Sequence, residues 1–197
     1  MSKAYSRDQE YWDNRYRSGG DSGAGSKGRL ADFKVETLNN IIRRESINSL
    51  LDFGSGDGQI ARRLDVEKPW LTDSSRVSRK ELRRQAFGRV VHPRIAPLLS
   101  VEMGISLDVT YHITDESLFT NYMTSLLKVS KRFVVIYSRI DELGPKIPRH
   151  IKSNDFVRFI EERSDWELTE KIDNPFKFEP EDRSHTSKSD FYVFSRK

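Results

Sequence analysis

Residues 50–58 read Leu-Leu-Asp-Phe-Gly-Ser-Gly-Asp-Gly, a short apolar run that ends in an acid and three alternating glycines. The apolar run predicts a buried strand, and the glycines predict a sharp turn out of it. Glycine lets the backbone turn without a steric penalty and brings backbone N–H groups close to a ligand. The stretch therefore predicts a nucleotide-cofactor loop, although a tight turn without a ligand would use the same glycines.

The glycine spacing distinguishes between cofactors. A dinucleotide fingerprint, G-x-G-x-x-G, would need a further glycine at position 59, where the chain has Gln59. The order acid-x-G-x-G-x-G instead resembles motif I of the class I S-adenosylmethionine (SAM)-dependent methyltransferases. The resemblance implies that SAM is the cofactor. It also implies that the loop holds the cofactor's amino acid part through Asp52, Gly54, Ser55, Gly56 and Gly58.

A second acid supports this interpretation. Asp73 ends the short apolar run 70–72 and, with Ser74 beside it, precedes a helix-like segment. In the family, an acid at this point accepts hydrogen bonds from both ribose hydroxyls, and a carboxylate can accept two charge-assisted bonds at once. The alternative is that Asp73 or Ser74 caps the following helix, and both roles are compatible.

The remaining chain alternates between strand and helix patterns. The predicted elements are a strand running into a loop over 104–113, a helix over 118–127, a strand over 132–137, a helix over 155–162, and strands at 166–168 and 191–194. This order predicts an α/β fold, a Rossmann-like doubly wound and mostly parallel sheet with a C-terminal antiparallel strand. The segment between 90 and 104 is short for a third strand and its loop, and the helix near 59–64 is brief.

The end of the strand over 104–113 faces the transferable methyl in this family. The resemblance therefore makes His112 the first candidate for a general base, because imidazole titrates near neutral pH. Asp108 is a candidate for orienting the substrate or the cofactor amine, and Tyr111 for lining the pocket. Structural roles in the loop are the alternative for all three residues. Arg149 and His150, in a later loop, are candidates for binding an acidic substrate.

The N-terminal 30 residues form a separate Gly/Ser-rich segment, with five glycines between positions 19 and 28. Such stretches are often flexible linkers. Alternatively, the backbone amides and Ser22 or Ser26 fold over the cofactor or substrate as a lid. The words G-G-x-S-G-A-G-S and L-A-x-F-K are similar to a branch of small bacterial class I methyltransferases. We expect residues 1–30 to be a cap or lid and residues 31–197 to be a single methyltransferase domain.

Composition fits one domain. A chain of 197 residues with 36% hydrophobic content can bury one core. It has no apolar stretch of membrane-spanning length and a polar start, so we expect a cytoplasmic protein that does not contact a membrane. The absence of cysteine excludes disulfides and thiolate ligands, and the four histidines lack metal-ligand spacing, so no metal is predicted.

The net charge of +4 is unevenly distributed. Segment 76–94 carries seven Lys or Arg residues against one acid, and a basic helix there could bind phosphates or simply face solvent. Base-amino methyltransferases generally carry an Asp/Asn-Pro-Pro-aromatic motif, whereas residues 108–111 read Asp-Val-Thr-Tyr. We therefore expect methyl transfer to a small-molecule or glycan-like acceptor. The alternatives are an RNA or protein methyltransferase that uses the basic helix 76–94, and a non-catalytic scaffold or partner subunit of the same fold.

Overall fold

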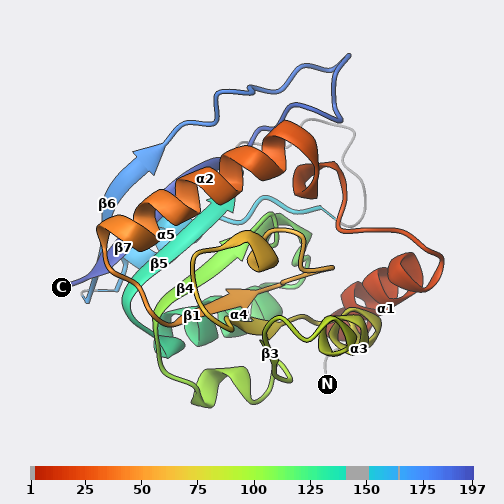
Figure 1. Ribbon diagram of the computed structural model, residues 1–197, viewed down its shortest axis with the longest axis horizontal. Helices are drawn as coiled ribbons and strands as arrows, with labels where there is room; N and C mark the ends of the chain where they lie inside the picture. The colour runs from red at the N-terminus through yellow and green to blue at the C-terminus, as the bar shows by residue number, and fades with distance from the viewer. Residues whose placement is uncertain (1–2, 141–150, 164) are drawn as a thin grey trace.

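The computed structural model describes residues 3–140, 151–163 and 165–197, and Arg149 and His150 lie outside this range. A seven-stranded sheet with the order β3-β2-β1-β4-β5-β7-β6 runs through the molecule (Figure 1). The strands are β1 Leu50–Phe53, β2 Trp70–Thr72, β3 Arg89–Val90, β4 Val101–Leu107, β5 Ser130–Ser138, β6 Trp166–Ile172 and β7 Asp190–Arg196. Strands β1 to β5 pair in parallel, and β7 runs antiparallel to both β5 and β6. This arrangement confirms the predicted fold class.

Helices cover both faces of the sheet (Figure 1). The helices of the described chain are α1 Lys3–Arg17, α2 Gly28–Arg44, α3 Arg76–Gln85, α4 Glu116–Val129 and α5 Phe156–Glu161. One apolar cluster joins the buried face of α2 to β1, β4, β5 and β7, and a second joins α4 and α5 to the opposite face. Among the described residues, no helix is long and apolar enough to cross a membrane.

The chain reverses its direction of travel across the sheet between β1 and β4. Strand β1 pairs with β2 on one side and with β4 on the other, so the loops after β1 and β4 diverge from adjacent strand ends. Open α/β sheets bind ligands at such a switch point, outside the carboxyl ends of the strands. Helix α1, which the sequence analysis did not predict, lies beside α3 beyond these strand ends (Figure 1).

The basic helix predicted over 76–94 is shorter than expected. Helix α3 ends at Gln85 because Ala86 adopts a left-handed conformation with φ 56°. Arg89 belongs to β3, and Arg94 follows that strand in a turn. Arg79 is buried and donates to the backbone carbonyls of Asp73 and Ser74, which removes it from the basic face.

The segments that connect β1 to β4 are short, as the sequence predicted for residues 59–64 and 90–104. Strand β3 has two residues, and the rest of segment 90–104 holds a short 3₁₀ helix, Ala96–Leu98, before β4 starts at Val101. The helix expected near 59–64 is a single 3₁₀ turn, Ala61–Arg63. Glu102, the one acid in segment 90–104, accepts hydrogen bonds from the backbone N–H groups of Asn48 and Ser49. Its role is therefore to cap a turn.

Candidate functional site

A cavity of about 750 Å³ opens at the carboxyl ends of β1, β2 and β4. Its size falls within the usual range for small-molecule and cofactor sites. The cavity brings together most of the predicted site residues, namely Asp52, Gly54, Ser55, Gly56, Asp73, Ser74, Asp108, Tyr111 and His112. Gly58 is the exception: a Cβ there would lie 2.7 Å from Phe87 and 2.8 Å from Leu82, so Gly58 packs against the side chains behind the loop.

The glycine-rich loop after β1 requires all three of its glycines. Gly54, Gly56 and Gly58 have φ values of 88°, 56° and 78°, a region that other residues rarely adopt. A Cβ on Gly54 would lie 2.4 Å from Val109 Cγ2, so the loop after β4 closes directly against this position. Ser55 holds the turn, because its hydroxyl donates to Asp52 O at 2.8 Å and accepts from Thr72 N at 3.2 Å. The side chain of Ser55 thus stabilises the turn.

Asp73 joins the loops that follow β1 and β2. Its Oδ2 accepts from Gly56 N at 2.9 Å, and its Oδ1 accepts from Ser75 N at 2.7 Å. Each carboxylate oxygen has two lone pairs, so Asp73 can still accept hydrogen bonds from a ligand. The cap of α3 is Ser75, whose Oγ accepts from Ser78 N at 3.1 Å. The alternative in which Asp73 or Ser74 caps that helix is therefore wrong.

Two buried acids make this end of the cavity electrostatically unusual. Burial raises the pKa of Asp52 to about 7, and the nearby Asp73 carboxylate contributes to that rise. Burial also raises the pKa of Asp73 to about 6, against the opposing effect of its two backbone hydrogen bonds. Desolvated carboxylates favour a cationic ligand, because its charge compensates for the lost hydration.

The N-terminal segment covers this end of the cavity. Ser22 Oγ accepts from Asp57 N at 2.9 Å, and Ser22 N donates to Asp57 Oδ2 at 3.2 Å. Helix α1 adds Asp13, which accepts from Val77 N at 3.2 Å, and Asp8, which accepts from Thr114 Oγ1 at 3.2 Å. The segment therefore contacts the loops after β1 and β4 and the first turn of α3. Helix α2 starts at Gly28, so the expected boundary between residues 30 and 31 falls inside this helix.

Helix α1 and its aromatic side chains were not predicted from the sequence. Trp12 and Tyr16 stack with ring centroids 5.9 Å apart, and both line the cavity. Tyr16 Oη and Ser22 Oγ are 3.0 Å apart, within hydrogen-bond distance. The four-residue spacing of these aromatic residues, in a segment without glycine or proline, could have indicated a helix here.

A buried ion pair forms the wall beside the end of β4. Lys34, only 2% exposed, donates from Nζ to Asp108 Oδ2 and to Gly25 O, the latter at 2.8 Å. Asp108 Oδ1 accepts from Ser189 Oγ at 2.8 Å. Both carboxylate oxygens of Asp108 are thus engaged within the protein. Lys34 could have been found from the sequence, because it lies midway between Leu30 and Leu38 on the apolar face of α2.

Tyr111 and His112 lie in a short 3₁₀ turn just beyond Asp108. Burial, with the Asp108 charge as a second cause, raises the pKa of the Tyr111 hydroxyl well above its usual value, so this group stays protonated. The His112 ring lies 4.4 Å from the Tyr111 ring and meets Trp12 edge-on at 5.1 Å. These side chains give the cavity an aromatic wall next to the ion pair, and a catalytic role for His112 stays a prediction.

No family model matches this chain, and a search of curated proteins finds no match. Solved structures do match it over nearly its whole length. Magnesium protoporphyrin IX methyltransferase (ChlM) from Synechocystis, with bound S-adenosylhomocysteine (SAH), superposes with a TM-score of 0.68 at 14% identity, covering 96% of this chain and 98% of that one. The N-methyltransferase NodS from Bradyrhizobium japonicum, also with SAH, gives 0.65 at 11% identity, covering 99% and 98%.

A putative RNA methyltransferase from Pyrococcus horikoshii matches less well, with a TM-score of 0.57 at 14% identity and coverage of 83% and 84%. At these identities the common property is the fold, because one fold serves many reactions. The chain has the Rossmann-like fold of the class I SAM-dependent methyltransferases.

Proposed function

We propose that this protein is a SAM-dependent methyltransferase that acts on a small-molecule or glycan-like acceptor. The observation that carries the proposal is the cavity at the switch point, where Gly54 and Gly56, both with positive φ, meet the buried carboxylates of Asp52 and Asp73. Structural neighbours that contain SAH support the same cofactor.

The residues present fit this cofactor chemically. The loop at Gly54 to Gly56 offers close backbone approach, and the carboxylate of Asp73 retains lone pairs for ribose hydroxyls. Asp52 adds negative charge near a ligand that carries a sulfonium and an ammonium group. When bound, SAM supplies an electrophilic methyl group.

The chain's own contribution to methyl transfer would be alignment and exclusion of water. Holding two reactants in position accounts for a large share of the rate enhancement in such displacements. His112 is the proposed general base for an acceptor whose proton must leave, since it lines the cavity beside Tyr111. Asp108, with both oxygens engaged by Lys34 and Ser189, is better suited to holding the β4 loop in place.

A small acceptor agrees with the covered cavity. Helix α1 contacts the loops around the opening through Asp8 and Asp13, which limits the access of a folded macromolecule. The basic surface of α3 is weaker than the sequence suggested, because Arg79 is buried and Arg84 pairs with Glu81 at 2.7 Å. These contacts favour a small acceptor over an RNA or protein substrate.

Isothermal titration calorimetry with SAM, SAH and NAD tests this proposal first. We expect binding of both adenosyl ligands at micromolar concentrations and none of NAD. A screen of acceptors with labelled SAM would then identify the methylated compound. Failure to bind either adenosyl ligand would refute the proposal and favour a non-catalytic scaffold.

A further inference from the structure

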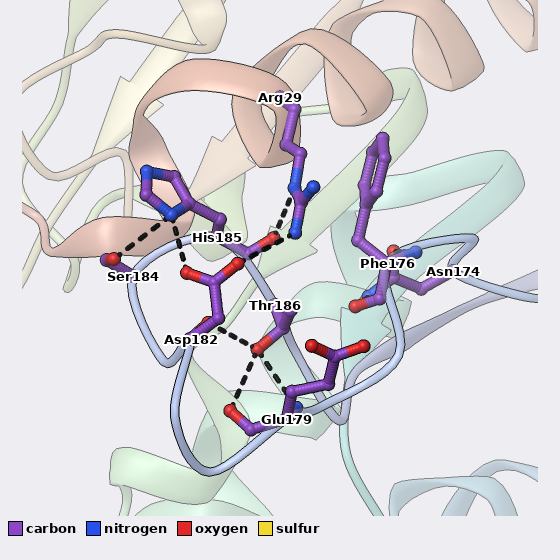
Figure 2. Close-up of polar contacts among 8 residues, drawn as sticks. All are labelled: Arg29, Asn174, Phe176, Glu179, Asp182, Ser184, His185 and Thr186. Carbon is purple, nitrogen blue, oxygen red and sulfur yellow. Dashed lines mark hydrogen bonds and ion pairs between the residues drawn. The ribbon is translucent and has the colours of Figure 1, made fainter.

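The connection between β6 and β7, residues 173–189, is an ordered loop packed against the start of α2 (Figure 2). Arg29 of α2 donates from Nε to His185 O at 2.7 Å and pairs with Asp182 Oδ2 at 3.2 Å. Its guanidinium also lies 4.7 Å from the centre of the Phe176 ring. Thr186 Oγ1 donates to Asp182 O at 2.6 Å, which closes the loop on itself. These contacts hold the loop in one conformation.

The loop contributes to the cavity at the end that adjoins the ion pair. Arg183, Thr186 and Ser187 line the cavity wall. Ser189, at the end of the loop, donates to Asp108 at 2.8 Å and so fixes the loop to the end of β4. The loop therefore belongs to the part of the cavity in which the acceptor would lie under the proposed function.

The charged side chains that line the cavity differ between its parts. Asp52 at the end of β1, with Asp57 and Asp73 in the loops after β1 and β2, lies at one end, and Asp8 of α1 lines the cavity beside Thr114, after β4. The part next to the β6–β7 loop contains Lys34, whose charge is compensated by Asp108, and Arg183.

Arg183 is the cation of this part whose charge is available to bind a ligand. Its Nε donates to Pro180 O at 3.1 Å, and its two terminal nitrogens have no ionic or hydrogen-bond partner within the described residues. Arg15, another cavity cation, is paired with Asp21, and Arg94 follows β3 on the far side of β2. An arginine fork of this kind matches a carboxylate or a phosphate, which it can bind through two parallel hydrogen bonds.

We infer that the acceptor carries an anionic group, a carboxylate or a phosphate, and that Arg183 is the residue that selects it. The inference rests on the proposed function, because it assigns this end of the cavity to the acceptor. The anionic group would bind at Arg183, so that the rest of the acceptor extends toward Tyr111 and His112. The negative charges near Asp52 and Asp73 would disfavour the reverse orientation.

Anion binding to the SAH-loaded protein tests this inference. Inorganic phosphate and acetate are titrated separately at constant ionic strength with chloride, and the rise in thermal stability is followed for the wild type, Arg183→Gln and Lys188→Gln. Lys188 is the matched control, because it is a cation of the same loop that does not line the cavity. We expect saturable stabilisation by at least one anion, weakened about tenfold or more in Arg183→Gln and unchanged in Lys188→Gln.

Equal anion responses in the wild type and Arg183→Gln, or no saturable response in the wild type, would overturn the inference. The difference between phosphate and acetate identifies which anionic group the site prefers. SAH affinity, measured by calorimetry on the same variants, reports separately on the proposed function and should be the same in all three proteins. If SAH does not bind, the anion titration on the free protein still decides whether Arg183 forms an anion site.

Discussion

The two ends of the cavity are built in different ways. The end that we assign to the cofactor is assembled from short, contiguous segments, residues 52–57 and 73–75, and it depends on backbone conformation and two buried acids. The end assigned to the acceptor joins the side chains of Lys34, Asp108 and Ser189 with the backbone carbonyl of Gly25 in one hydrogen-bonded group. A local sequence motif can specify the first kind of site, whereas only a complete fold can specify the second.

The difference is also electrostatic. Near the β1 loop, burial raises the pKa values of Asp52 and Asp73, and the charges of Lys34 and Arg79 offset this rise only in part. Beside β4, the Asp108 carboxylate has a buried lysine as its partner. The first end therefore favours a cationic ligand, whereas the charge of Asp108 at the second end is balanced within the protein by Lys34.

The largest effect should come from removing Lys34. In Lys34→Met, the Asp108 carboxylate, 19% exposed, would lose its ion partner, and breaking a buried pair costs about 3 to 5 kcal/mol. We expect the free energy of unfolding, measured by urea titration, to fall by that amount. The double variant Lys34→Met/Asp108→Asn should recover part of the loss. A loss below about 1 kcal/mol would mean that the pair is no more important than a surface salt bridge.

Gly56→Val should abolish cofactor binding while leaving most of the fold intact. The residue has φ 56°, and an added Cβ would lie 2.1 Å from Ser22 Oγ, so both the loop and its cover must shift. We expect SAH affinity measured by calorimetry to fall about 100-fold or more, from left-handed strain together with lost backbone contacts.

The control for this prediction is Gly56→Val combined with Ser22→Gly, which removes the clash with the cover. If the loop itself binds the cofactor, the double variant stays defective. Recovery of affinity in the double variant would assign the effect to the N-terminal segment instead.

Asp73→Ala tests the second part of the motif. Losing hydrogen bonds from a charged acceptor should weaken SAH binding by about 1.5 to 3 kcal/mol, which is about 10- to 100-fold. Asp65→Ala is the matched control, because Asp65 is an exposed acid paired with Arg43 and does not line the cavity. Unchanged SAH affinity in Asp73→Ala, measured by calorimetry, would exclude Asp73 as a ribose ligand.

The smallest predicted effect on ligand affinity is a pH dependence. Because the pKa values of Asp52 and Asp73 are raised in the folded state, that state binds more protons than the unfolded chain between about pH 4 and about pH 7. The free energy of unfolding therefore decreases as the pH rises through this range. A cationic ligand favours the ionised acids, so SAM affinity should increase over the same range, by up to about tenfold.

SAH is the natural control for the pH experiment, since it lacks the sulfonium charge. We expect its affinity, measured by calorimetry, to increase less than that of SAM as the pH rises. An identical pH dependence for both ligands would show that the sulfonium does not sense the two acids.

Much of the fold was predictable because its signals are local. The helical spacing around Leu118 and Met123 predicted α4, and the β-rich run around Val134 predicted β5, since each pattern repeats over contiguous residues. The left-handed turn at Ala86 was not predicted, and it ends α3 well before Arg94. Alanine gives no sequence signal for that conformation, which the surrounding structure imposes.

The sequence by itself determined the position of the glycine-rich loop and of Asp73 at the end of the next strand, because glycine conformation and an acid at a strand end are local properties. It did not reveal that Lys34 would pair with Asp108, or that Arg29 would fix the loop carrying Arg183. Lys34 and Asp108 are 74 positions apart in the sequence, and Arg29 is 153 or more positions from its partners in the loop. Folding alone brings these residues together. Only the tertiary structure decided them, because burial and charge compensation depend on which distant segments share a wall of the cavity.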